Sequence, residues 1–321
     1  MRVGMTGGGA RRAAAVGCVV SCLAGAALAQ GAGETPSRGD VFDSARSTAR
    51  STAEWLARGV DSWFGDRPFE DGGEVRDGRL SLALIKPAHE SAEFNLRFHA
   101  RFRLPNLQES AYAFVGRDNL DEVVRDQPGA LTRRQRQIAE PDDRNDFFVG
   151  LGLAVREAVD LRVGVRGGLK PYLQGRYRKP WQVGSAGLME FRQTVFWTVD
   201  DHVGATAALS YERPLTPTMA LRWLGAATAT QESRRLEWTG SVALFKDMGE
   251  QRLLTLEGIA AGAQHTGVTF TEAGLQTRWS QPLGRDWLLG ELRVGHFWRR
   301  PDATATREGA WGAGGTLTIK F

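Results

Sequence analysis

The sequence after its first thirty residues contains no cysteine and no long apolar run. Both cysteines, Cys18 and Cys22, lie in the leading segment, so removal of that segment would leave no disulfide or thiolate chemistry. No later apolar run approaches the roughly 20 residues that a membrane-spanning helix needs. The sequence therefore argues against a disulfide-stabilised domain and against a helical membrane protein.

Histidine is also scarce, and glycine pairs lack a functional context. The five histidines are scattered along the chain and show no zinc-ligand spacing. None of the glycine pairs at 72–73, 167–168 and 314–315 stands between a predicted strand and a predicted helix, which is where the glycines of a phosphate-binding loop lie. We therefore expect neither a metal nor a cofactor.

The first 29 residues are typical of a secretory signal peptide. Arg2, Arg11 and Arg12 precede an apolar core over 13–26, and the small-residue cleavage site lies at 27–29. Cleavage there removes three arginines and no acidic residue, so the formal charge falls from +4 to +1. The isoelectric point of about 9.3 thus belongs largely to the leader, which weakens the case for nucleic-acid binding. The alternative is a lipobox at 19–22, with acylation of its cysteine.

Residues 30–78 divide into a linker, a helix and a connector. The glycine-containing stretch 30–40 predicts a flexible linker. Between Phe42 and Trp63, apolar residues recur at alternating steps of three and four, which predicts one amphipathic helix. The turn-rich stretch 65–78 predicts a connector. We expect a periplasmic helix that packs on the following domain; the alternatives are a plug inside that domain or a helix that binds a partner.

From residue 79 onward, apolar and polar residues alternate. Phe94, Leu96 and Phe98 are each followed by a polar residue, which predicts a strand with one apolar and one polar face. About fourteen such segments, separated by turn residues, predict an all-β antiparallel up-and-down transmembrane barrel over 79–321, with twelve strands as the alternative. The segments are 79–86, 92–104, 109–117, 145–156, 159–168, 172–181, 187–199, 203–213, 217–228, 234–246, 251–262, 266–280, 286–298 and 307–321.

Two further patterns support this strand count. Short turns, such as the one at 157–158, alternate with connections that include the long polar loop over 118–145, and outer-membrane barrels have short periplasmic turns and longer outer loops. Aromatic residues lie mostly near predicted strand ends on the apolar face, as expected at two membrane interfaces. These residues are Trp181, Trp197, Trp238, Trp279, Trp287, Trp298, Trp311, Tyr177 and Tyr211.

The final segment alternates up to a terminal aromatic residue, Phe321. The chain thus resembles Gram-negative outer-membrane β-barrel proteins without an assigned activity, whose assembly machinery recognises a C-terminal aromatic residue. The resemblance implies three partners, which are outer-membrane lipid, the barrel assembly machinery and periplasmic chaperones, and it assigns no functional residue. The matching stretches are Phe94 to Leu104, Arg176 to Trp181, Phe196-Trp197, Leu221-Arg222-Trp223, Asp286-Trp287-Leu288 and Glu291-Leu292.

The polar face of the strands is rich in arginine and predicts a charged lumen. A midplane arginine facing hydrocarbon would cost about 2–4 kcal/mol, so these residues are expected to face inward. They could form an electropositive wall along which small anions pass, or a self-neutralising network that fills the barrel. The candidate lumen residues are Arg97, His99, Arg101, Arg103, Arg162, Arg166, Arg176, Arg178, Arg192, Arg222, Glu237, Glu291 and Arg293.

Catalytic patterns are weak. The spacing of Asp200 and His202 resembles the Asp-x-His half of the omptin protease site, but no second acidic pair accompanies it. Aspartates are common in tight turns, so we expect no enzyme. The sequence favours a passive pore of the outer membrane with a weakly anion-favouring lumen; the alternatives are a plugged envelope scaffold and a surface hydrolase.

Overall fold

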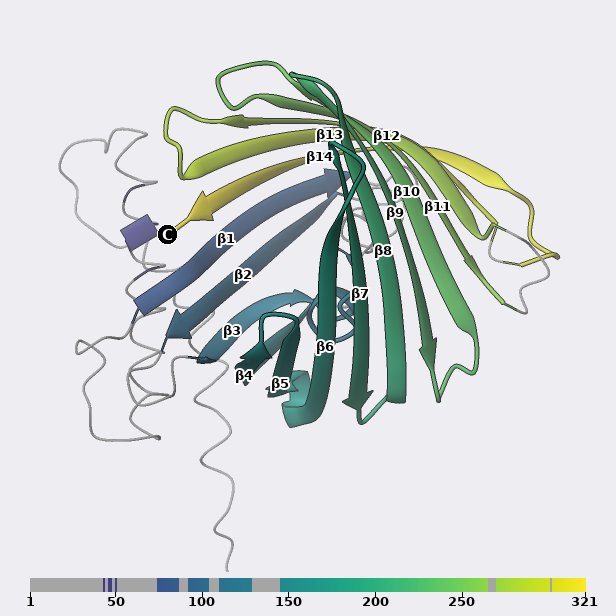
Figure 1. Ribbon diagram of the computed structural model, residues 1–321. Helices are drawn as coiled ribbons and strands as arrows, with labels where there is room; N and C mark the ends of the chain where they lie inside the picture. The colour runs from purple at the N-terminus through teal and green to yellow at the C-terminus, as the bar shows by residue number, and fades with distance from the viewer. Residues whose placement is uncertain are drawn as a thin grey trace, which may run out of the picture. The chain divides into compact units, whose positions relative to one another are not determined.

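The strands close into one antiparallel barrel. The computed structural model describes residues 74–86, 92–103, 110–128, 145–264, 270–300 and 302–321, together with Asp43, Arg46, Ser47 and Arg50. Within these ranges fourteen strands follow one another round the wall, and the first pairs with the last. Figure 1 shows β1 and β14 side by side, with the C-terminus at the end of β14.

The bounds of the strands are β1 (Glu74–Lys86), β2 (Glu93–Arg103), β3 (Ala111–Asn119), β4 (Asn145–Arg156), β5 (Val159–Arg166), β6 (Lys170–Val183), β7 (Gly187–Thr198), β8 (His202–Thr216), β9 (Met219–Thr230), β10 (Leu236–Asp247), β11 (Leu253–Ala263), β12 (Glu272–Pro282), β13 (Leu288–Arg299) and β14 (Glu308–Lys320). Two short helices, α3 (Leu120–Val123) and η2 (Gly167–Leu169), lie in connections.

The two faces of the wall differ in polarity. Alternate residues along a strand share one face, and the two sets are called its two parities. On one parity, large apolar side chains are exposed, including Leu84 at 58%, Phe94 at 68% and Leu292 at 65%. The opposite parity carries arginines, threonines and acidic residues, many of them buried, such as Arg97 and Glu257. In a closed barrel these parities are the outer and the inner surface, so the apolar residues of the alternating pattern point outward.

The structure confirms the predicted fourteen strands, and the alternative of twelve is wrong. The start of the first strand was also predicted incorrectly: β1 begins at Glu74, and the final residues of the expected connector belong to it. These residues do not alternate in polarity, and the register shifts between Val75 and Asp77, so the two-residue period is lost there. The predicted signal peptide, linker and helix lie outside the described residues, except for the four helical positions at 43, 46, 47 and 50.

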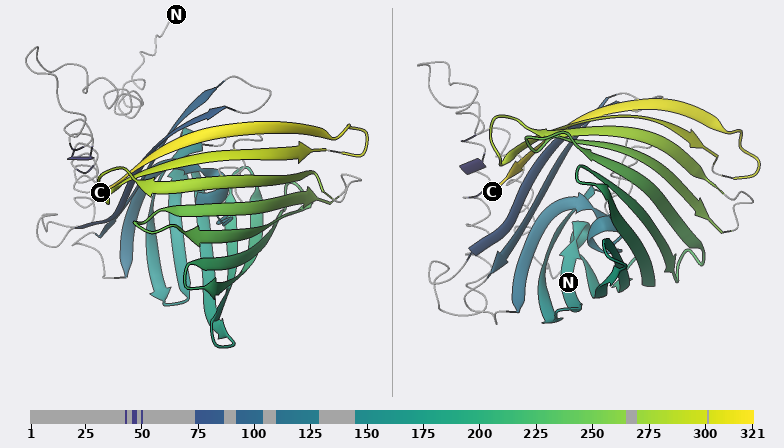
Figure 2. Two further views of the ribbon diagram at one scale, coloured as in Figure 1. Left: turned by 90° about the horizontal axis from the view of Figure 1, so that it is seen from above. Right: turned by 45° about the horizontal axis from the view of Figure 1, so that its top comes forward.

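The connections alternate as expected. One end of the barrel, here called the short-turn end, has tight turns such as the one after β4. The opposite end, called the long-loop end, carries the connection from β3 to β4, of which α3 forms the first part. The two views in Figure 2 show the strands running between these ends. Within the described residues, no helix is both long and apolar enough to cross a bilayer.

Outward-facing aromatic residues lie near both ends. Trp197, Trp298 and Trp311 lie toward the long-loop end and are 38%, 36% and 66% exposed, respectively. Trp181 lies toward the short-turn end and is 38% exposed. Trp223 also faces outward on β9. Two bands of exposed aromatic side chains therefore border the apolar outer surface.

Candidate functional site: a constriction across the lumen

The connection after β3 folds into the barrel instead of away from it. Residues 119–128, called here the inner segment, begin with Asn119, whose side chain accepts a hydrogen bond from Asp121 N at 2.8 Å and so caps α3. Val124 is fully buried within a cluster of inward-facing aromatic residues from four strands. These residues are Phe114 on β3, Phe148 on β4, Tyr172 on β6 and Phe196 on β7. This apolar contact anchors the inner segment to the inside of the wall.

The backbone of the inner segment is held by a side chain of the wall. Gln174 Nε2 donates to Val123 O at 3.1 Å and to Val124 O at 2.7 Å. Buried carbonyl groups need such donors, because an unpaired buried polar group is costly. The amide of Gln174 therefore fixes the chain at the point where α3 ends.

Asp126 makes three hydrogen bonds with the wall of the barrel. Its Oδ1 accepts from Arg176 Nη1 at 2.9 Å and from Arg192 Nη1 at 3.3 Å, while its Oδ2 accepts from Thr194 Oγ1 at 2.9 Å. The Asp126 side chain is 6% exposed. Arg176 lies six residues along β6 from its long-loop end, or about 20 Å at strand rise. The inner segment thus reaches deep into the lumen.

The inner segment also crosses to the far side of the barrel. Arg125 Nη2 donates to Asp201 Oδ1 at 2.6 Å, next to the start of β8. Gln127 Nε2 donates to Thr228 Oγ1 on β9 at 3.2 Å. Because the strand order places β9 six strands from β3 in a ring of fourteen, a chain that leaves β3 and contacts β9 spans most of the lumen.

The wall beside Asp126 carries more arginine than carboxylate. Asp160 accepts from Arg162 at 3.1 Å and from Arg176 Nη2 at 2.7 Å. Tyr112 adds to this group, because its hydroxyl donates to Asp160 at 2.8 Å and accepts from Arg162 Nε at 2.9 Å. Three arginines (Arg162, Arg176 and Arg192) therefore share two aspartates (Asp126 and Asp160).

The opposite wall is closer to neutral. Glu257 is 1% exposed, accepts from Gln276 Nε2 at 2.8 Å and lies 3.9 Å from Arg222 Nη2. Closer to the short-turn end, Glu291 pairs with Arg293. Acidic and basic side chains are therefore paired on this part of the wall.

The alternation of the strands places all thirteen candidate lumen residues on the inner surface. Arg97, Arg162, Arg166, Arg176, Arg192, Arg222 and Arg293 have at most about a quarter of their side chains exposed. His99, Arg101 and Arg103 share the inner face of β2. Arg178 is 61% exposed and pairs with Glu190, while Glu237 lies at the start of β10; both are rim residues. Of the thirteen candidates, Arg162, Arg176 and Arg192 are those that donate hydrogen bonds to Asp126 or Asp160 among the described contacts.

Sequence reasoning did not identify the inner segment or its aromatic anchor. Phe114, Phe148 and Phe196 occupy the parity that is otherwise polar, and this departure from alternation was the available signal. Asp126 lies in a polar loop with a positive φ of 53°. Its role depends on contacts with β6 and β7, and its sequence neighbours do not indicate them.

Asp200 and His202 make separate contacts. A hydrogen bond from Lys170, with a smaller contribution from one donated by Arg166, holds the pKa of Asp200 below its ordinary value. His202 instead faces Glu232, with 3.8 Å between His202 Nδ1 and Glu232 Oε2. The geometry therefore gives these two residues different partners.

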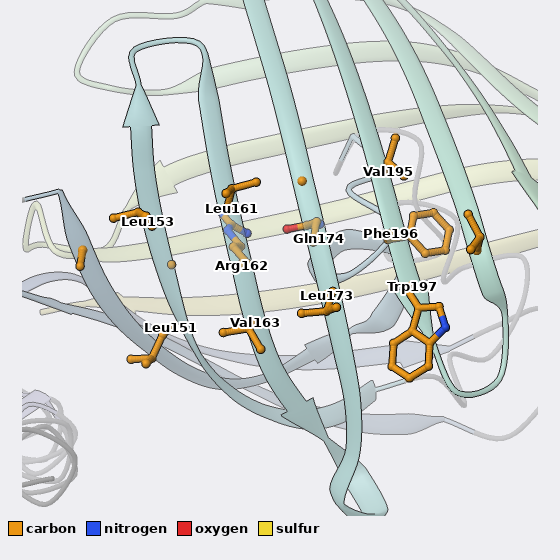
Figure 3. Close-up of a pocket in the computed structure, with 14 residues that line it drawn as sticks. Leu151, Leu153, Leu161, Arg162, Val163, Leu173, Gln174, Val195, Phe196 and Trp197 are labelled. Atoms are coloured by element: carbon orange, nitrogen blue, oxygen red, sulfur yellow. The ribbon is translucent and has the colours of Figure 1, made fainter. Parts of the chain in front are cut away.

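An apolar groove lies on the outer surface of the barrel. A groove of about 660 Å³ is lined mainly by outward-facing apolar residues of β4 to β8. Figure 3 shows Leu161, Val163, Leu173 and Trp197 around it. Gly175 contributes no side chain there. The groove is a depression in the apolar outer surface, separate from the charged lumen.

Comparisons with known proteins give distant structural likeness. No protein-family model matches the chain, and no curated protein matches it. Among solved structures, the outer membrane channel DcaP of Acinetobacter baumannii has a TM-score of 0.46 at 9% identity, over 78% of this chain and 98% of that chain. OccK11 of Pseudomonas aeruginosa has a TM-score of 0.42 at 10% identity, over 78% and 96%. A loop deletion mutant of OmpT, an outer membrane protein of Vibrio cholerae, has a TM-score of 0.45 at 11% identity, over 78% and 100%. With identities of 9–11% and TM-scores of 0.42–0.46, these likenesses assign no functional role to any residue of this chain.

Proposed function

We propose that the chain is an outer-membrane barrel that conducts small solutes, with a weak preference for anions, past a constriction formed by its inner segment. The observation that carries the proposal is the division of the wall into an exposed apolar outer face and a charged inner face. Proposed partners are outer-membrane lipid, small anionic solutes, and the periplasmic chaperones and assembly machinery that would recognise Phe321.

The outer face supports a position in a membrane. Leucine, valine and tryptophan side chains stay more than a third exposed on strand after strand. Charged residues of the same parity, including Arg117, Lys179, Arg213 and Lys246, lie close to strand ends. Apolar patches of a soluble monomer rarely exceed a few hundred Å², whereas a membrane barrel carries a continuous apolar band bordered by aromatic residues.

The inner face supports a preference for anions. Three arginines share two aspartates at the constriction, which leaves an excess of one positive charge. Arg101 adds a further guanidinium over the Tyr112 ring, at 4.3 Å from its centroid. Rings and patches of arginine select anions in other pores by the same electrostatics.

A plugged scaffold is the main alternative, because the inner segment spans much of the lumen. Planar bilayer recordings of refolded protein discriminate the two functions. A pore gives ohmic channels whose reversal potential in a salt gradient indicates anion preference, and a scaffold gives negligible conductance. We propose no enzymatic activity. Recovery of the mature protein in the soluble periplasmic fraction would overturn the proposed location.

A further inference from the structure

We infer that the contacts of Asp126 form a carboxylate-binding site that the protein fills with its own side chain, and that carboxylate-bearing solutes compete for it. The inference deepens the proposed function and rests on it for its biological role. It names the class of solute and the residues that would bind it. These residues are Arg176 on β6 and Arg192 and Thr194 on β7.

The geometry is that of a bound carboxylate. Both oxygens of Asp126 are engaged: one accepts from two guanidinium groups, at 2.9 and 3.3 Å, and the other from the Thr194 hydroxyl at 2.9 Å. Guanidinium groups bind carboxylates through short, charge-assisted hydrogen bonds. All three donors belong to the rigid wall, so they would remain in place if the carboxylate of the inner segment left.

The site is buried and keeps one donor to spare. Asp126 is 5% exposed and Thr194 is 1% exposed, so the site is shielded from bulk water. Among the described residues, the buried Nε of Arg192 has no hydrogen-bond acceptor, which leaves an additional donor for a ligand larger than one carboxylate group.

The position of the site suggests what competition would do. Apolar contacts of Val124 anchor the start of the inner segment, while the hydrogen bonds of Asp126 and Gln127 hold the part that crosses the lumen. A solute carboxylate that displaces Asp126 would free this part and bind beside the remaining excess arginine. A tethered competitor acts at an effective concentration in the millimolar range or above, so the site would respond only to solute that accumulates to similar levels.

The test is chemical rescue of Asp126→Ala by acetate, which replaces the deleted carboxylate. Calorimetry on detergent-solubilised protein should show saturable acetate binding, at least about tenfold tighter than to the wild type, because the internal competitor is gone. Acetate should also raise the unfolding temperature of this variant more than chloride or phosphate at equal ionic strength. Asp126→Gly, which also deletes the carboxylate and suits the positive φ of 53° at this position, serves as a second variant with the same expected result if the alanine variant does not fold.

Two controls make the result specific. Asp302→Ala removes a carboxylate from an exposed loop, where Asp302 accepts from Thr304 N and Ala305 N, and should show no acetate effect. Arg192→Gln in the Asp126→Ala background should abolish acetate binding. Equal effects of chloride, phosphate and acetate would overturn the assignment to carboxylates, and absence of binding would overturn the site. Because calorimetry needs no conductance, a silent bilayer recording would refute the pore alone.

Discussion

The backbone of Phe321 pairs with that of Gly78 across the closure of the barrel. Phe321 N donates to Gly78 O at 3.0 Å, and Gly78 N donates to Phe321 O at 3.2 Å. The Phe321 ring occupies the space into which a Cβ at Gly78 would project, and it stacks on Phe98 with 6.2 Å between ring centroids. Because glycine has no side chain, the terminal ring can lie against β1 and β2 where the sheet closes.

Gly78→Ala should therefore destabilise the barrel. A methyl group at Gly78 would force the Phe321 ring or the strand to move, and overpacking of this kind costs about 1–3 kcal/mol. The measurement is the free energy of unfolding in urea, with the protein in lipid vesicles. Gly240→Ala is a matched control, because the nearest atom to its added Cβ is Leu224 O at 3.7 Å; its effect should stay within about 0.5 kcal/mol.

A double-mutant cycle identifies the cause of that destabilisation. In a Phe321→Ala background the ring is absent, so Gly78→Ala should lose part of its cost, and the rest should remain because the main-chain oxygen of residue 321 would lie 2.8 Å from the added Cβ. An unchanged cost in both backgrounds would show that the backbone oxygen alone accounts for the destabilisation and that the terminal ring moves aside freely.

Val242→Arg tests whether the outer face contacts lipid. Val242 is 50% exposed near the middle of β10. In a bilayer, an arginine near the midplane costs about 2–4 kcal/mol, whereas on a water-exposed surface the change would be close to neutral. Folding yield into vesicles, read as the fraction with heat-modifiable mobility on a gel, measures the difference. Leu283→Arg, in a turn at the short-turn end, is the control and should fold normally; equal yields for both variants would contradict a membrane position.

Val124→Asp tests the anchor of the inner segment. Burial of a valine side chain contributes about 1.5–3 kcal/mol, and a carboxylate among four aromatic rings adds a desolvation cost. The population with the inner segment displaced should rise by roughly tenfold or more, with an increase in single-channel conductance. Val124→Ala should give a smaller increase, and Leu283→Asp none. Unchanged conductance in Val124→Asp would mean that the inner segment does not limit the current.

The barrel was predictable from sequence because each strand must satisfy a local rule. One side of β2, for example, must be apolar wherever the opposite side carries Arg97 and His99, so the two-residue period is visible without knowledge of any other strand. The first residues of β1 escaped prediction since the register shift between Val75 and Asp77 breaks that period.

The constriction was not predictable in the same way. Val124 and Asp126 lie in a polar stretch without periodicity, and their positions depend on β4, β6 and β7. Contacts between distant parts of the chain leave little local signal, apart from aromatic residues on the wrong parity. The sequence therefore predicted a charged lumen but not which of its arginines would be brought together.

Replacement of Arg162 and Arg192 by glutamine should lower the anion preference of the pore. Three arginines and two aspartates meet at the constriction, so the double variant changes the net charge there from +1 to −1. A unit charge about 8 Å from a passing ion contributes about 0.5 kcal/mol at the dielectric constant of water, so each arginine removed should lower the permeability of an anion and raise that of a cation by roughly twofold each.

Reversal potentials in a gradient of potassium chloride measure the ratio of the two permeabilities, and Arg252→Gln, in an exposed turn with a 46% exposed side chain, is the control. The change should be clear at 0.1 M salt, where the Debye length is about 10 Å, and should fade at 1 M, where it is about 3 Å. A salt-independent change would mean that the substitutions altered the width of the constriction and not its charge. An unchanged permeability ratio at both salt concentrations would mean that other residues set the selectivity of the pore. Arg97 and Arg101 on β2 would then be the next residues to replace.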